Sequence, residues 1–253
     1  MHNLPINRVV THGPLSKTEE GKISMKAKSF IFCCLLFLTL LSCDRSHDGS
    51  LDSNFETQLV DIVTYTGLDQ DNHATFRLDG RDDDPAVMLY TKVDAPSKVK
   101  VNERILLTYD VNHRAPDGSY WDINATGFSR IINDSIRVNA KPLDTYSMRP
   151  IKLNSAWRTG EFINIYGQAE YTGKSRLLYM MIDKETKYND TVQAYLVHDL
   201  LGTPADSIFY WRDFYLSVNV GALKSPSAPC RVLRLNINDA NNPSVTHRDY
   251  NIK

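Results

Sequence analysis

Two acidic segments contain residue types that could bind a metal ion. In residues 69–74, Asp69 and Asp71 are spaced like the first ligands of a calcium loop. The glycine that makes the sharp turn at position six is missing, and Gly80 stands where the bidentate glutamate should follow. Residues 79–85 hold four aspartates and end at Pro85, and aspartate, glycine and proline are also ordinary turn residues. The sequence therefore predicts solvated hairpin loops here, with no metal site and no cofactor.

Catalytic motifs are incomplete throughout the chain. The segment GFSRI, residues 127–131, lacks the second glycine of a nucleophile elbow, and neither H-E-x-x-H nor a phosphate-binding loop occurs. His198 and Asp199 could suggest a base and its orienting group, but neighbouring residues of a strand point to opposite faces. We therefore expect His198 to be a surface or core residue and the protein not to be an enzyme. A hydrolase site assembled across the fold is the alternative.

Aromatic residues in SIFYWRDFYLSVNV, residues 207–220, suggest a binding surface. One parity of this expected strand has the character of a core face: Ile208, Tyr210, Phe214, Leu216 and Val218. The alternate residues of the strand would then form an aromatic strip exposed to solvent, a surface suited to binding sugars or protein partners. Packing against the neighbouring domain, or a bulge near Asp213, is the other interpretation. The candidate binding residues, including two from the first half of the chain, are Phe209, Trp211, Tyr215, Tyr120 and Trp121.

An apolar segment at residues 30–41 follows two lysines and precedes a small residue and Cys43. It is shorter than the roughly 20 residues that span a bilayer, but it has the length of a secretory signal. The sequence Leu40-Leu41-Ser42-Cys43 resembles the lipobox of bacterial lipoproteins, which implies cleavage before the cysteine and acylation of its thiol. We therefore predict a signal region at residues 1–42, with translation starting at Met25. Cys43 would be the lipid attachment site that holds the chain to the bilayer.

Composition limits the remaining possibilities. Cys33 and Cys34 would be removed with the signal, so we expect no internal disulfide and a fold stabilised by packing. The whole chain has a formal net charge of −1, and loss of the basic signal would make it more acidic. A nucleic-acid partner is therefore not expected, because it would require a basic face.

Short runs rich in Val, Ile, Thr, Tyr and Phe alternate with turn residues along the rest of the chain, which predicts an all-β protein. In RILLTYDVNH, Ile105, Leu107 and Tyr109 share one face, and in CRVLRLNIND, Leu233 and Leu235 do the same. No segment shows a sustained 3.6-residue period, so only short helices are expected. The predicted order is a flexible tether at 43–54, a small β-barrel at 55–140, a proline-containing linker at 141–150 and a β-sandwich at 151–253.

The lipobox, the two β-domains and the closing LRLNIND resemble the NigD-like lipoproteins of anaerobic Gram-negative bacteria. The resemblance implies an OB-like barrel followed by an immunoglobulin-like sandwich. The family name comes from a bacteriocin gene cluster and carries no established biochemical activity, so the resemblance bears on the fold more than on the function.

The sequence thus predicts a lipid-anchored, non-catalytic module that binds a protein or a glycan at the cell envelope. We expect the anchor in the outer membrane, and the sequence does not distinguish its periplasmic leaflet from its surface-facing leaflet. One alternative is a bacteriocin-immunity or self-protection lipoprotein, and another is an envelope hydrolase with a site at the domain interface. Three D-[ST]-apolar tripeptides, beginning at Asp134, Asp190 and Asp206, also resemble bacterial O-glycosylation acceptors.

Overall fold

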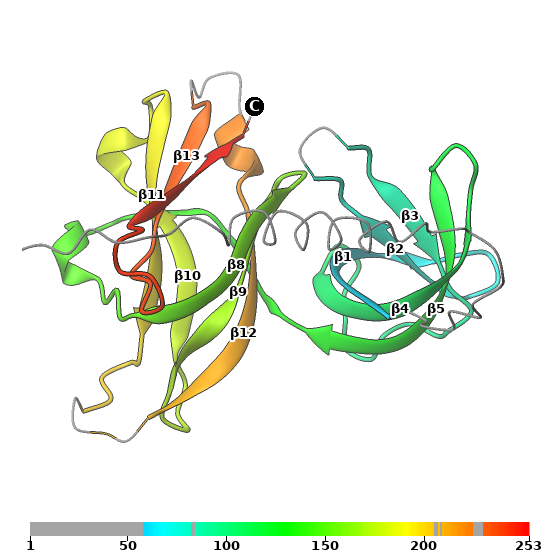
Figure 1. Cartoon of the computed structure of the whole chain (residues 1–253), viewed down its shortest axis with the longest axis horizontal. Coiled ribbons are helices and arrows are strands. Elements are labelled where there is room, and N and C mark those ends of the chain that lie inside the picture. The colour runs from blue at the N-terminus through cyan, green and yellow to red at the C-terminus, as the bar shows by residue number, and fades with distance from the viewer. Residues whose placement is uncertain (1–57, 82–83, 205–206, 208, 225–229, 253) are drawn as a thin grey trace, which may run out of the picture. The chain divides into compact units, whose positions relative to one another are not determined.

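The computed structural model describes residues 58–81, 84–204, 207, 209–224 and 230–252 (Figure 1). The predicted signal region, Cys43 and the tether lie outside these residues. Residues from Asn54 onward form one compact unit. The described part of this unit is built from β-strands and three short 3₁₀ helices, as predicted: η1 (Leu143–Thr145), η2 (Lys184–Thr186) and η3 (Gly221–Lys224). In the same residues no helix is long and apolar enough to cross a membrane.

The first five strands close into a barrel with the order β1-β2-β3-β5-β4. β3 and β5 pair in parallel, whereas the other neighbours are antiparallel, which is the arrangement of an OB-like barrel. The predicted OB-like barrel is confirmed. Its strands are β1 (Leu59–Leu68), β2 (Ala74–Leu78), β3 (Val87–Tyr90), β4 (Arg104–Arg114) and β5 (Tyr120–Arg130).

The barrel interior is filled by the predicted alternating face of β4. Ile105, Leu107 and Tyr109 are fully buried, together with Phe76 and Leu89 from β2 and β3. A closed barrel of this size has room inside only for side chains. Successive residues of each strand therefore point alternately into the barrel interior and out of it.

The other nine strands form two sheets that share a single hydrophobic core. Leu233 and Leu235 are fully buried in it, as their spacing predicted. One sheet has five strands: β14 (His247–Asn251), β13 (Val232–Asn236), β11 (Thr191–Asp199), β10 (Leu177–Ile182) and β7 (Arg137–Val138). The other has four: β6 (Ile132–Ser135), β12 (Tyr210–Asn219), β9 (Phe162–Tyr171) and β8 (Ile151–Thr159).

Strand β12 follows the predicted parity only in its second half. Phe214, Leu216 and Val218 are buried in the core, but Tyr210 is 55% exposed, so its placement in the core was wrong. Tyr210 begins the strand, where its ring and that of Tyr171 lie perpendicular, with 5.4 Å between the ring centroids. Ile208 lies outside the described residues.

The boundary between barrel and sandwich lies earlier than residue 140. The last barrel strand ends at Arg130, and the short strands β6 and β7 already belong to the two sheets. β6 pairs in parallel with β12, and β7 pairs in parallel with β10. The segment assigned to the end of the first domain therefore supplies one edge strand to each sheet of the second.

His198 is a core residue and not half of a catalytic pair. It is fully buried, and its Nδ1 lies 3.4 Å from the carbonyl oxygen of Pro150. Burial lowers the pKa of this imidazole below its ordinary value. Asp199, on the other face of the strand, accepts a hydrogen bond from the backbone N–H of Leu201 at 2.8 Å.

Candidate functional site

A buried arginine joins the barrel to the sandwich. Arg104 begins β4 and is 1% exposed. Its guanidinium forms an ion pair with Asp79, donates to Thr64 Oγ1 at 3.1 Å and lies 4.0 Å from the centroid of the Phe162 ring. It also reaches Thr159 Oγ1 at 3.4 Å, on β8. Burial lowers the pKa of Arg104, whereas the carboxylate of Asp79 opposes that shift.

Asp79 was predicted to be part of a solvated turn, and this was wrong. The residue is 8% exposed, and its second carboxylate oxygen accepts from Arg77 Nε at 2.9 Å. Two arginines therefore neutralise this carboxylate at the point where the acidic segment leaves β2. Asp69 does serve a turn, because its Oδ1 accepts from the backbone N–H groups of Asp71 and His73. Asp82 and Asp83 lie outside the described residues.

A β-bulge in β8 sets the direction of Trp157. Leu153 pairs with Gly167 and Ser155 with Tyr166, so Asn154 is an extra residue on β8. Before the bulge, odd-numbered residues such as Leu153 face the core. After it, odd-numbered residues face away from the core, toward the barrel, so Trp157 lines a cavity at the barrel instead of packing between the two sheets.

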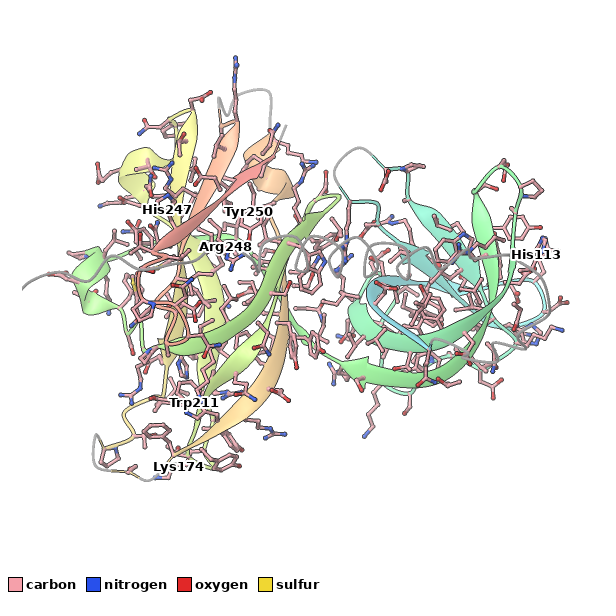
Figure 2. All side chains as sticks on the ribbon, viewed as in Figure 1. His113, Lys174, Trp211, His247, Arg248 and Tyr250 are labelled. Carbon is pink, nitrogen blue, oxygen red and sulfur yellow. The ribbon has the colours of Figure 1, made fainter. Side chains whose placement is uncertain are left out.

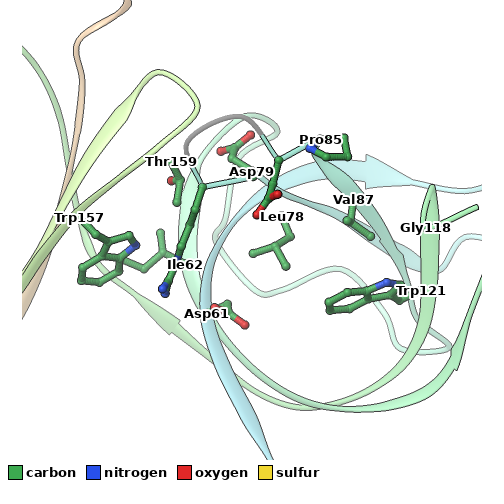
Figure 3. A pocket seen from close by; sticks show the side chains of 13 residues that line it. Asp61, Ile62, Leu78, Asp79, Pro85, Val87, Gly118, Trp121, Trp157 and Thr159 are labelled. Atoms are coloured by element: carbon green, nitrogen blue, oxygen red, sulfur yellow. The ribbon is translucent and has the colours of Figure 1, made fainter. Parts of the chain in front are cut away.

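That cavity, of about 440 Å³, lies where the barrel meets the four-stranded sheet (Figure 3). Trp121 of β5 and Trp157 of β8 lie on opposite sides of it, and Asp61, Leu78 and Val87 line the space between them. Asp61 Oδ2 accepts a hydrogen bond from the hydroxyl of the buried Tyr109 at 2.9 Å. Burial and the nearby carboxylate of Asp61 raise the pKa of Tyr109 well above its usual range, so Tyr109 keeps its proton and remains a donor.

A second cavity, of about 270 Å³, continues from the first, because Asp61, Ile62, Arg81 and Trp157 line both. Its outer wall is a stacked pair of rings from β9 and β12, Tyr166 and Tyr215, whose centroids are 4.4 Å apart. Burial, and then the neighbouring Tyr166, raise the pKa of Tyr215. We call the two cavities together the junction groove.

The other predicted aromatic residues lie elsewhere. Trp211 is partly buried, with Lys152 Nζ 4.4 Å from the centroid of its ring and Phe209 set edge-on at 6.1 Å. Tyr215 is separated from this pair by Asp213 and stacks on Tyr166. The structure thus places Phe209 with Trp211 and brings Tyr215 and Trp121 to the junction groove.

Tyr120 lies on another surface of the barrel. Its ring meets the edge of Tyr90, with 5.8 Å between centroids, beside a shallow cavity that also involves Asp69, Asp71 and Asp122. In the described residues, no group of three or more histidine, cysteine or carboxylate side chains is arranged to hold a metal ion.

The chemistry available in the junction groove is recognition by ring faces and charged groups. The Asp79 carboxylate is occupied by two arginines, and Asp61 accepts a hydrogen bond from the Tyr109 hydroxyl. The guanidinium of the exposed Arg81 makes no hydrogen bond or ion pair with another described residue. No histidine is among the described residues that line either cavity. Trp157, shared by both cavities, was not singled out from the sequence, although Gly167 inside an alternating strand is the kind of residue that marks a bulge.

An OB-like barrel followed by a two-sheet sandwich, with a groove at their junction, defines a class of two-part all-β proteins. No family model matches the chain, and comparison with curated proteins also finds no match. Solved structures do share the fold. A Bacteroides vulgatus protein of unknown function superposes with a TM-score of 0.58 at 13% identity, over 76% of this chain and 90% of that one.

A NigD-like immunity protein from Bacteroides caccae superposes with a TM-score of 0.52 at 18% identity, over 76% of this chain and 91% of that one. A candidate lipoprotein from Bacteroides fragilis does so with a TM-score of 0.50 at 10% identity, over 78% and 98%. The resemblance to NigD-like proteins is therefore confirmed in the fold.

Proposed function

We propose that the chain is a non-catalytic lipoprotein of the cell envelope that binds a glycan in the junction groove. The observation that carries this proposal is the pair Trp121 and Trp157, which lie on opposite sides of one cavity beside Asp61 and Arg81. The apolar face of a sugar ring can pack on an indole, while its hydroxyls bond to a carboxylate or a guanidinium.

The shape of the site favours a glycan over a protein partner. A cavity of about 440 Å³ lies in the range that holds small ligands, roughly 300–1,000 Å³. A stable protein interface needs about 800 Å² on each partner and is built on a broader surface. Aromatic walls on both sides, with Asp61 and Arg81 beside them, suit a ring-shaped ligand that carries hydroxyl groups.

Trp157→Ala is expected to abolish retention of the protein on a glycan array, because it removes the ring shared by both cavities. Truncating such a central aromatic residue typically costs about 2 kcal/mol or more, which is roughly a 30-fold loss of affinity. Affinity should be measured by intrinsic fluorescence in a Trp211→Phe background. The chain contains three tryptophans, so the remaining signal then comes from Trp121 and Trp157.

Trp211→Ala is the matched control and should leave the affinity unchanged. Loss of binding in this control, with Trp157→Ala still binding, would place the glycan on the Phe209–Trp211 surface and contradict the proposed groove. Circular dichroism of both variants checks that the fold is retained.

The envelope location rests on the predicted anchor at Cys43 and on the structural likeness to a candidate lipoprotein. We expect the mass of the mature amino-terminal peptide to show cleavage before Cys43 and the addition of acyl chains. We place the anchor in the outer membrane, which fractionation of the envelope can test. A native protein that retains residues 25–42 and an unmodified thiol at Cys43 would contradict this part of the proposal.

Self-protection against a bacteriocin is a second candidate function, favoured by the similarity to a structure named as a NigD-like immunity protein. Deletion of the gene separates the two functions. Unchanged bacteriocin sensitivity would leave only the glycan-binding function.

A further inference from the structure

One end of the sandwich displays apolar side chains that no other part of the described chain covers. β10 begins beside the end of β11, where Leu177 pairs with Asp199, and β12 begins beside the end of β9, where Tyr210 pairs with Tyr171. The connections after β9 and after β11 therefore come to the same end of the two sheets. Four large apolar residues lie in these two connections or directly beside them, with 42–55% of their surface exposed: Leu177, Leu201, Phe209 and Tyr210.

Leu201 is held in this exposed position by a strained turn. Its φ is +52°, a region that bulky residues rarely adopt. Asp199 Oδ1 accepts its backbone N–H at 2.8 Å, and the N–H of Thr203 closes the turn on the carbonyl of Leu200 at 3.2 Å. An exposed leucine in a backbone conformation that favours glycine or asparagine contributes nothing to the core, and such strain tends to accumulate at functional positions.

Cations lie at the same end of the sandwich, beside Tyr171, the ring that contacts Tyr210. The guanidinium groups of Arg176 and Arg212 lie 5.3 Å and 5.0 Å from the centroid of the Tyr171 ring. Lys174 is exposed in the turn after β9, and Figure 2 shows it at the same end of the sandwich as Trp211. None of these three cations forms an ion pair with a carboxylate that the structure describes. Burial lowers the pKa of Arg176, and because both guanidinium groups lie about 5 Å from one ring, the charge of Arg212 lowers it further.

We propose that this end of the sandwich binds the surface of a bilayer that carries anionic headgroups. We call it the loop-end patch and define it as Leu177, Leu201, Phe209 and Tyr210 with Lys174, Arg176 and Arg212. Leucine and aromatic side chains at the tips of turns can enter the boundary between headgroups and acyl chains, while lysine and arginine remain with the phosphates. Aromatic rings are also enriched at this depth of a membrane.

The opposite end of the sandwich differs in charge. There Lys187 Nζ lies 5.4 Å from the centroid of the Tyr188 ring, and Tyr188 is 69% exposed. Three carboxylates, of Asp183, Glu185 and Asp190, lie near that pair along the chain, and the last two form ion pairs with Lys184 and Arg231, so these groups together carry no excess of positive charge. At the loop-end patch the carboxylate of Asp199 accepts the backbone N–H of Leu201, and those of Glu170 and Asp213 bond to Arg149 and Gln168.

The proposal does not depend on the junction groove, because none of its residues lines either cavity. An anchor at Cys43 would already keep the chain near the bilayer, so a weak patch would be enough to orient it. The patch can therefore be tested on protein without the anchor. Residues from Asn54 onward form one compact unit with two buried cores, so a chain lacking residues 1–43 is expected to fold.

Cosedimentation of this shortened chain with vesicles tests the patch. We expect binding to phosphatidylcholine vesicles that contain phosphatidylglycerol, weakening as salt is raised, and no binding to phosphatidylcholine alone. Arg212→Gln should weaken partitioning about fivefold, the effect of one cation at an anionic surface. Leu201→Asn, which tolerates the positive φ, should weaken it about tenfold through loss of a buried apolar side chain.

Lys187→Gln and Tyr188→Ser, at the opposite end, are the matched controls and should leave partitioning unchanged. Equal loss in these controls would overturn the proposal, as would absence of binding or equal binding to both kinds of vesicle. The proposal would also be overturned if a soluble polyanion displaces the protein from the vesicles while Leu201→Asn partitions as well as the unchanged chain. Those two results together would indicate a site for an anionic polymer.

Discussion

Replacing Arg104 with methionine is expected to lower the free energy of unfolding by about 3–5 kcal/mol. The substitution leaves the carboxylate of Asp79 buried without its main partner, and it removes the hydrogen bonds that connect β4 to Thr159 and, at 3.5 Å, to Asn164 of the sandwich. Because whole domains are stable by about 5–15 kcal/mol, this one change removes a large share of the total. Urea unfolding followed by circular dichroism measures it.

Two further variants isolate the cause. Arg130→Met removes an arginine whose side chain is 63% exposed and paired with Glu103 at 3.1 Å, so its cost should stay below about 1 kcal/mol. The double variant Arg104→Met with Asp79→Leu should recover part of the loss, because no uncompensated charge remains. If the double variant is less stable than Arg104→Met alone, the explanation by an unpaired carboxylate is wrong.

Gly167→Ala is expected to destabilise the protein by about 1–3 kcal/mol and to disturb the junction groove. A Cβ at this position would lie 2.6 Å from the carbonyl oxygen of Lys152, a backbone atom that can move only with its strand. The glycine sits opposite the bulge in β8 that directs Trp157 toward the barrel. The measurements are urea unfolding and, in a chain carrying Trp121→Phe and Trp211→Phe, the emission maximum of Trp157.

Gly127→Ala is the matched control for this substitution. Gly127 is also a strand glycine, but its added Cβ would meet only the side chain of Thr108, at an ordinary 3.6 Å. We expect no loss of stability and no change in tryptophan emission. Equal effects in the two variants would mean that general strand propensity, and not the close approach at the bulge, explains the result.

Alternation along single strands predicted most of the fold. Ile105, Leu107 and Tyr109, and likewise Leu233 and Leu235, are buried because period-two alternation is a property of each strand itself. The edge strands β6 and β7 were assigned to the barrel and not to the sandwich, because they contain few residues and pair with strands far along the chain. Their own sequence carries no signal of those partners.

The candidate site was predictable only in part. Tyr215 and Trp121 were identified from their residue type and strand position, and both line the junction groove. Trp157 was missed because a bulge shifts its parity, and parity is the property on which the prediction depended. Asp79 was read as a turn residue because its partner Arg104 lies on another strand, and a short acidic segment does not show which of its carboxylates is buried.

The position of β6 and β7 has a consequence for the order of folding during synthesis. All five barrel strands emerge before any strand of the sandwich core, so the barrel can close early. β6 and β7 emerge next, but they must wait for β12 and β10, and such distant pairings form slowly. The two edges of the sandwich thus stay open until late, whereas Thr159 and Asn164, which contact Arg104, emerge earlier on β8 and β9.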